Sequence, residues 1–182
     1  MSKKRLSKLD APKNITNIEK KLKDGDFIVS KTDLKGKITY CNEIFVDMCG
    51  YPPKDLIGAN HNLIRHPDMP KIAFKVLWDL IQKKKEFFGL VKNLRADGGY
   101  YWVFAYITAD LDANGNIIGY SSFRRKPPQS AVDAIIPIYK LLVDAERTGG
   151  MEASGKLLND YLKQNKTTYE ELVITLQKDI RV

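Results

Sequence analysis

The chain is poor in cysteine and histidine and has no long hydrophobic run. Its 182 residues include two cysteines, Cys41 and Cys49, and two histidines, His61 and His66, in no spacing typical of a zinc site. No apolar run approaches the ~20 residues that a membrane-spanning helix needs. The opening MSKKRLSKLDAPKN is charged and lacks the apolar stretch of a secretory signal. We therefore expect a cytoplasmic protein with no structural metal and no direct membrane insertion.

Sequence signatures of catalysis are also missing. The chain has no phosphate-binding loop, no Ser–His–Asp arrangement and no paired catalytic carboxylates, so we do not expect an enzyme. The net charge of +8 raises the question of a nucleic-acid partner. However, the basic residues are scattered rather than gathered on one reading element, and Lys83 to Lys85 fit the last turn of a helix. We expect no nucleic-acid partner.

What the chain does have is enough apolar residues for a core: 43% are hydrophobic and 10% aromatic. Composition and pattern divide it into three segments. Residues 1–25 form a polar extension in which Ile15, Ile18 and Leu22 predict a short amphipathic helix over about residues 14–23. Residues 26–126 form the main domain, and residues 127–182, which follow a double proline, form a helical extension.

Within the main domain, two β-rich stretches at 27–32 and 37–40 are separated by the turn DLKG and predict a hairpin. A helix then begins at the cap Asn42 and ends at Gly50. A longer helix is predicted from Met69-Pro70 to about Lys85. Three strands with tight turns follow, at about 87–95, 99–109 and 116–125. This order predicts an α+β fold: a five-stranded antiparallel sheet with short helices on one face, an N-terminal helix and a C-terminal helical tail.

Particular strings in this order resemble a known family. DLKGKITYCNEIFVDMCGY resembles the N-terminal half of a PAS domain, and DGGYYWVFAYITADLDANGNIIGYSS resembles its C-terminal half. The most specific match is HNLIRHPDMPKIAFKVLWDLI followed by VKNLRADG, which resembles the sensor domain of bacterial aerotaxis receptors and of stand-alone PAS proteins of energy taxis. The resemblance covers roughly residues 26–145.

The resemblance implies a redox or oxygen sensor for energy taxis that binds FAD non-covalently, with FMN and haem as less favoured ligands. It places Arg65, His66 and Asp68 at the RHPD positions, with Trp78, Asn93 and Arg124, among the cofactor-binding residues. Helical spacing and strand alternation add further wall residues, Phe74 on the long helix and Val91 and Val103 on the sheet. The same alternation puts Trp102 on the opposite sheet face, where we expect it to pack against a helix.

Alternative interpretations of these residues stay open. Phe74 and Trp78 could be core residues, and Asp68 could only cap the long helix. His66 could be an axial ligand of haem. A flavin–cysteine adduct is not expected, because the segment 60–66 has no cysteine. The whole domain could also be a cofactor-free interaction or dimerisation module.

The resemblance also implies a partner: a membrane-bound methyl-accepting chemotaxis receptor or its signalling helices, with the chain itself expected to form a homodimer. Residues 129–147 are predicted to form one helix, and Gly149-Gly150 and residues 165–167 separate two shorter ones. Two outcomes are possible for residues 148–182. They fold back on the PAS domain, or they dock on the receptor.

Overall fold

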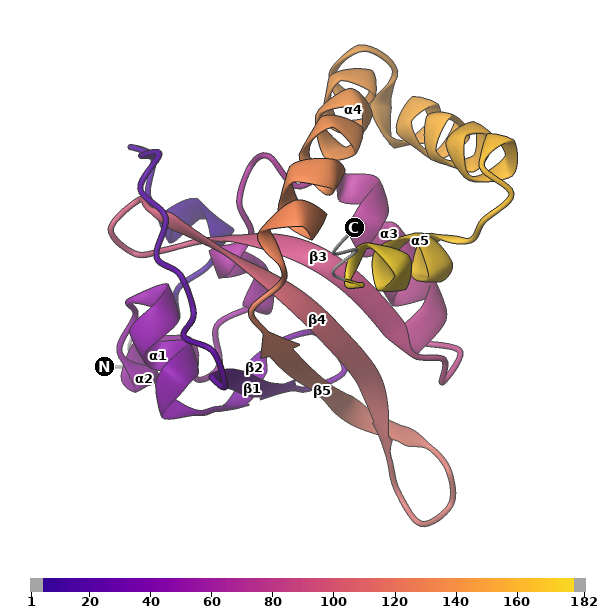
Figure 1. Ribbon diagram of the computed structural model, residues 1–182. Coiled ribbons are helices and arrows are strands. Elements are labelled where there is room, and N and C mark those ends of the chain that lie inside the picture. The colour runs from indigo at the N-terminus through magenta and orange to yellow at the C-terminus, as the bar shows by residue number, and fades with distance from the viewer. Residues whose placement is uncertain (1–4, 179–182) are drawn as a thin grey trace.

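A computed structural model describes residues 5–178. Its sheet consists of five strands, β1 (Phe27–Thr32), β2 (Ile38–Cys41), β3 (Phe87–Leu94), β4 (Tyr100–Leu111) and β5 (Ile117–Arg125). The helices are α1 (Glu43–Cys49), α2 (Pro53–Leu56), α3 (Lys71–Ile81), α4 (Gln129–Gln164) and α5 (Tyr169–Leu176), with 3-10 turns η1 (Lys8–Asp10) and η2 (His61–Ile64). Figure 1 shows the sheet crossed by the C-terminal helices.

The five strands form one antiparallel sheet, as the sequence predicted, and their order is β2-β1-β5-β4-β3. Turn chemistry sets the register of β3 and β4, which pair from Phe87 with Ile107 to Leu94 with Tyr100. The residues with odd numbers on β3 and β4 face one side of the sheet and those with even numbers face the other. We call these the inner face, which carries Val91 and Asn93, and the outer face, which carries Trp102.

The helix α1 has the ends that its sequence predicts. The Asn42 side chain accepts a hydrogen bond from the Phe45 N–H at 3.1 Å, and Gly50 takes the left-handed conformation with φ of 76°. Phe45, Met48 and Cys49 are buried on one side. Together with Ile28 of β1 and Val103 of β4 they belong to a hydrophobic cluster between the short helices and the inner face.

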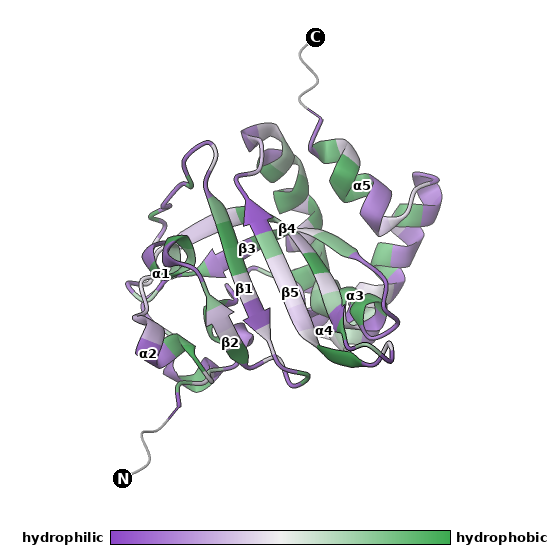
Figure 2. Cartoon of the chain, turned by 90° about the horizontal axis from the view of Figure 1, so that it is seen from below, coloured by the Kyte–Doolittle hydropathy of each residue, from purple (hydrophilic) through white to green (hydrophobic). Residues whose placement is uncertain are grey.

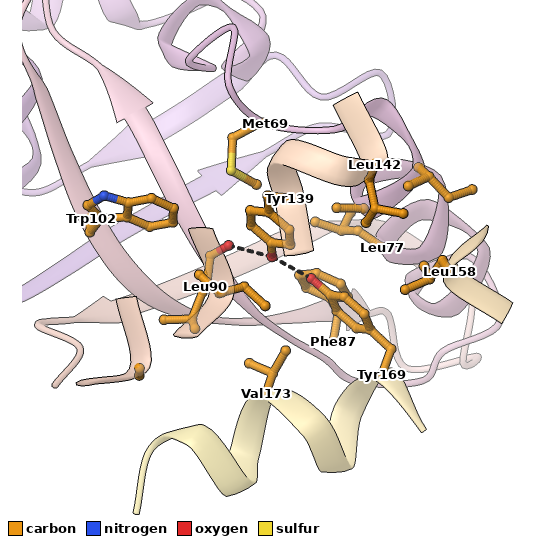
Figure 3. Packing of buried hydrophobic residues seen from close by; sticks show 14 of the residues in the cluster. Met69, Leu77, Phe87, Leu90, Trp102, Tyr139, Leu142, Leu158, Tyr169 and Val173 are labelled. Carbon is orange, nitrogen blue, oxygen red and sulfur yellow. Dashed lines mark hydrogen bonds between the residues drawn. The ribbon is translucent and has the colours of Figure 1, made fainter. Parts of the chain in front are cut away.

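A second cluster joins the sheet to the C-terminal helices. Trp102 is 7% exposed, and its ring stacks on Tyr139 of α4 with the centroids 6.5 Å apart. The Tyr139 hydroxyl donates to the Leu90 carbonyl at 2.8 Å and lies 2.8 Å from the Tyr169 hydroxyl of α5, as Figure 3 shows. The prediction that Trp102 packs against a helix is confirmed.

The C-terminal helices fold back on the domain. Within α4, Gly150 has φ of 69° and ψ of −168°, so two helical halves meet at a kink. The second half contributes Leu158 to the cluster that contains Ile72 of α3, and α5 contributes Tyr169 and Val173. Figure 2 shows that α4 and α5 carry hydrophobic as well as hydrophilic stretches, as expected of helices with one buried side. The breaks at Gly149-Gly150 and near residue 165 lie where the sequence predicted them.

The predicted helix over residues 14–23 is wrong. This segment is extended, and the Ile18 carbonyl accepts from the Tyr100 N–H at 2.9 Å while the Lys20 N–H donates to the Tyr100 carbonyl at 2.9 Å. A ten-residue helix is marginal by itself, and here the start of β4 offers backbone partners instead. Gly98 permits the approach, because an added Cβ would lie 2.2 Å from the Asn14 carbonyl oxygen.

The helix α3 is shorter than predicted. It ends at Ile81 rather than near Lys85, and Lys84 has the left-handed φ of 59°. The Lys85 N–H donates to the Leu80 carbonyl at 3.0 Å, so the lysines form the turn that leads into β3. Charge patterning at a helix end does not distinguish the last turn from the loop that follows it.

Candidate functional site

A cavity of about 290 Å³ lies between α3, η2 and the inner face of the sheet. Its apolar wall comes from two sources. Phe74, Leu77, Trp78 and Ile81 project from α3, as the helical spacing predicted. The sheet contributes a facing wall of residues from three strands: Val91, Ala105, Ile107 and Tyr120. Trp78 and Tyr120 meet edge to face, with the ring centroids 5.4 Å apart.

One end of the cavity is polar. Ser30 of β1, Asn93 of β3, and Ser122 and Arg124 of β5 line it, and all four residues are at most 8% exposed. The Arg124 Nη2 donates to the Ser30 Oγ. In contrast, Nδ2 of Asn93, Oγ of Ser122, and Nε and Nη1 of Arg124 are buried and have no hydrogen-bond partner among residues 5–178. Buried polar groups are normally satisfied, so these atoms indicate a polar ligand.

Arg124 is the most unusual of these groups. It is 3% exposed, and no carboxylate among residues 5–178 forms an ion pair with it. Burial lowers the pKa of Arg124, but a guanidinium stays charged in proteins. Its Cζ lies 4.6 Å from the centroid of the Phe45 ring, which supplies part of the missing stabilisation. A ligand with an electron-rich or anionic edge would supply the rest.

His61 lines the same end of the cavity. Its ring stacks on Phe45 with the centroids 5.7 Å apart, and its Nε2 is 3.3 Å from the Ser30 Oγ. Burial, together with repulsion from the Arg124 charge, lowers the pKa of His61 to about 3. His61 is therefore neutral at physiological pH and leaves Arg124 as the cation at this end.

Arg65 lies elsewhere on the cavity wall, on the loop that follows η2. Its Cζ is 4.8 Å from the centroid of the Phe74 ring. The backbone around Arg65 forms an antiparallel bridge with Asn93, and the Lys8 Nζ donates to the Arg65 carbonyl. Unlike Arg124, Arg65 is only half-buried, so its guanidinium is accessible to a group at the edge of the cavity.

Of the nine residues predicted to bind a cofactor, the structure brings six to this cavity: Arg65, Phe74, Trp78, Val91, Asn93 and Arg124. The other three do not line it. Val103 faces the same side of the sheet but is fully buried in the cluster with Phe45. Ala105, two residues along the strand, takes the lining position instead.

His66 and Asp68 also lie outside the cavity. His66 is 4% exposed, its Nδ1 accepts from the Asp68 N–H at 3.1 Å, and its ring packs against Tyr100. The Asp68 side chain is 65% exposed and lies 2.6 Å from the Lys92 Nζ. Asp68 does not cap α3 either, because the first residue flanking that helix is Pro70, which makes no side-chain cap. The compact turn directs both side chains away from the cavity.

Sequence reasoning missed Ser30, His61, Tyr120 and Ser122. Alternation along β5 could have found Tyr120 and Ser122, because they share a face with Arg124. Pairing then finds Ser30, which lies opposite Ser122. No such signal exists for His61, which sits in a 3-10 turn without a clear periodicity.

The geometry argues against haem ligation by His66 and adduct formation by a cysteine. His66 was the proposed haem ligand, and it does not reach the cavity, so no observation supports axial ligation by this residue. Neither cysteine lines the cavity. Cys49 is buried, which raises the pKa of its thiol to about 11 and makes it a poor nucleophile.

Comparison with known proteins gives a consistent result. Residues 38–124 match a family model described as the PAS fold. The Escherichia coli aerotaxis receptor is 40% identical over 134 residues, which is 74% of this chain but 26% of that receptor. Phototropin-2 of Oryza sativa is 30% identical over 83 residues, which is 46% of this chain and 9% of that protein. The chain therefore spans about a quarter of the aerotaxis receptor.

Solved structures agree on the fold. The dark structure of the Aureochrome1 light-oxygen-voltage domain covers 65% of this chain with a TM-score of 0.55 and 20% identity, and 86% of that domain is matched. A light-oxygen-voltage domain studied with a flavin analogue gives a TM-score of 0.54 at 22% identity, covering 61% of this chain and 83% of that one. None of the helices within residues 5–178 combines the length and the low polarity that crossing a membrane requires. Residues 38–124 therefore have the PAS fold, and the chain is similar in sequence to the Escherichia coli aerotaxis receptor over 134 residues.

Proposed function

We propose that this chain is a sensor that binds a flavin in the cavity beneath α3, and that the preferred flavin is FAD. The polar end of the cavity carries the proposal. Asn93 has an unpartnered Nδ2, and Arg124 has an unpartnered Nε and Nη1, beside an apolar slot. A flavin ring is apolar on its faces and has donors and acceptors along one edge, so it suits both parts of this cavity. When bound, it would supply redox chemistry, which the side chains of the cavity do not have.

The protein's part in this function is recognition. The α3 wall would exclude water from the ring faces, and the Asn93 amide would form hydrogen bonds with the polar edge of the ring. Arg124 would favour a ligand edge that gains negative charge, because the guanidinium has no carboxylate partner. Ser30 and Phe45 hold this guanidinium in place. We propose binding and signalling rather than catalysis.

Flavin content of the purified chain tests the proposal. We expect a yellow protein, or a colourless one that takes up FAD on reconstitution. Arg124→Gln and Asn93→Leu should each lower the flavin retained per chain while far-ultraviolet circular dichroism stays unchanged. Lys37→Gln is a matched control, because Lys37 is exposed and does not line the cavity. Full flavin occupancy in both cavity variants would refute the site, and a folded wild-type chain without flavin affinity would refute the function.

The signalling partner belongs to the same proposal. The 40% identity with the aerotaxis receptor supports a methyl-accepting chemotaxis receptor, or its signalling helices, as the protein to which this domain reports in the cytoplasm. The proposed homodimer would use the outer face. There the Phe123 side chain is 42% exposed. The centroid of its ring lies 6.2 Å from that of Tyr106, which lies 5.0 Å from that of Phe88.

The exposed part of the outer face, around Phe123, also favours a second function, a cofactor-free interaction module. The two functions predict different behaviour. If the chain never binds flavin but self-associates, and Phe123→Ser makes it monomeric, the module is the better description. If flavin binds and Phe123→Ser leaves its content unchanged, the cavity and the outer face serve separate steps of one sensor.

A further inference from the structure

Lys92 of β3 is held by three residues of one loop. β3 is the last strand of the sheet and has a neighbouring strand, β4, on one side only. At its open edge the Lys92 carbonyl accepts from the His66 N–H at 3.3 Å, and the Lys92 N–H donates to the Met69 Sδ at 3.2 Å. The Lys92 Nζ donates to the Asp68 Oδ2 at 2.6 Å. We call His66, Asp68 and Met69, which lie between η2 and α3, the clamp.

The clamp is a rigid unit anchored in the core. Backbone groups at a sheet edge need partners from outside the sheet, and here one closed turn supplies them. The Met69 N–H donates to the His66 carbonyl and the Asp68 N–H to the His66 Nδ1, both at 3.1 Å. Met69 is 4% exposed and belongs to the cluster with Trp102 that Figure 3 shows. The clamp therefore fixes where this part of β3 lies.

The clamp and the cavity are on opposite sides of the strand. Arg65 and Asn93 form an antiparallel bridge, so their side chains lie opposite each other, and both line the cavity. Lys92 points to the outer face, where its Nζ lies 4.2 Å from the centroid of the Tyr100 ring. His66 packs against the same ring, with the centroids 6.0 Å apart. The clamp thus reaches β3 at its edge and outer face and not from the cavity.

We propose that His66, Asp68 and Met69 are positioning residues of the ligand site, which hold Lys92 so that the adjacent Asn93 presents its amide to the ligand. The inference rests on the proposed function, because it takes Asn93 to contact the flavin. Asn93 is the last residue but one of β3, and strand ends open most easily. Its Nδ2 has no hydrogen-bond partner among residues 5–178, so the position of this group depends on the backbone that the clamp holds.

Titration of the flavin-free full chain with FAD tests the proposal. Asp68→Ala and Lys92→Met should each weaken FAD binding about fivefold, as expected of residues that act on a ligand without touching it. The melting temperature should hardly change, because the Asp68 side chain is 65% exposed and such ion pairs add little stability. Asp79→Ala is the matched control. Asp79 pairs with Lys75 at 2.7 Å on α3, both side chains being about half exposed, and this variant should bind FAD as wild type does.

A double-variant cycle shows whether the clamp acts through Asn93. If it does, the chain with both Asn93→Leu and Asp68→Ala should bind FAD as Asn93→Leu alone does, because the amide that the clamp positions is already gone. A further loss of about fivefold in the double variant would show that Asp68 reaches the ligand by another route, and would overturn the proposal.

Amide hydrogen exchange follows the clamp without a ligand. In the flavin-free chain, Asp68→Ala should speed exchange at Lys92 and Asn93 and leave the amides of β1, three strands away, unchanged. Unchanged exchange at Lys92, wild-type affinity for FAD in both Asp68→Ala and Lys92→Met, or a loss of affinity that follows a fall in melting temperature would each overturn the clamp. Failure of the wild-type chain to bind FAD would instead overturn the proposed function and, with it, the role of the clamp in ligand binding.

Discussion

Removal of one oxygen atom from Tyr139 tests whether the C-terminal helices are part of the domain. The Tyr139 side chain is 2% exposed, and its hydroxyl is shared by the Leu90 carbonyl and the Tyr169 hydroxyl, each at 2.8 Å. Tyr139→Phe keeps the stacking on Trp102 but leaves both partners buried and unsatisfied. At ~1–3 kcal/mol for each of the two unsatisfied groups, the free energy of unfolding should fall by ~2–6 kcal/mol.

Tyr169→Phe is the comparison that separates the two hydrogen bonds. In this variant Tyr139 still donates to Leu90, so only one bond is lost and we expect a cost of ~1 kcal/mol. The double variant has no Tyr169 hydroxyl left to satisfy. It should therefore cost less than the sum of the single variants, and the difference measures the coupling between the helices.

Urea unfolding followed by far-ultraviolet circular dichroism and by tryptophan fluorescence gives both quantities. Trp102 reports directly on α4, because its ring lies against Tyr139. We expect coincident transitions and an unchanged dependence on urea concentration. A loss below ~0.5 kcal/mol in Tyr139→Phe, too small for two orphaned groups, would refute the buried hydroxyl network and favour helices that dock on a partner.

Three other measurements test the packing and the electrostatics. Trp102→Ala should lower the free energy of unfolding by ~3–5 kcal/mol, and an unchanged melting temperature would show that α4 does not cover this ring. Gly98→Ala should lower the free energy of unfolding by at least ~1–2 kcal/mol, because residue 98 has a left-handed φ of 87°. The variant should also displace Asn14 and so increase proteolysis of the N-terminal segment. Equal cleavage of this segment in wild type and variant would contradict the contact between Asn14 and Gly98. Burial and the Lys92 charge lower the pKa of His66 to about 4. Unfolding restores an ordinary pKa, so the unfolded state takes up the proton first and stability should fall as pH drops from about 6.5 to 4. His66→Gln should make that slope shallower, while buried His61, whose pKa is lowered to about 3, still contributes to it. An equal slope in both proteins would contradict a neutral, buried His66.

The elements that sequence reasoning predicted well are those with local causes. Asn42 and Gly50 define α1 by capping, and strand alternation places Asn93 and Trp102 on opposite faces whatever the rest of the chain does. The segment 14–23 has the right spacing for a helix but finds backbone partners on Tyr100. Tertiary pairing therefore overrides a weak local preference, and sequence periodicity carries no information about it.

The same distinction applies to the site. Residues on regular elements, such as Trp78 and Asn93, could be placed from periodicity once a cavity was assumed, whereas Arg124 was predicted from the family resemblance. His66 and Asp68 could not, because the turn after Arg65 closes on itself through the His66 Nδ1. Adjacent residues in a loop can face opposite directions. A short string that resembles a binding motif does not tell which of its side chains reach the ligand.

The two polar regions of the cavity have different relations to the C-terminal helix. Arg124 lies on β5, which continues through Lys126 and two prolines into α4, so it is tied to α4 along the chain. Arg65 is connected to α4 through α3 instead, because its guanidinium lies over the Phe74 ring and the Ile72 N–H of the same helix donates to Glu146 of α4. A ligand that neutralises only Arg124 would act on α4 through the stiff proline link, whereas one that also reaches Arg65 would act on the Ile72 contact as well. We therefore expect ligands with and without an anionic tail to give different hydrogen-exchange patterns in α4, even where both fill the same apolar slot.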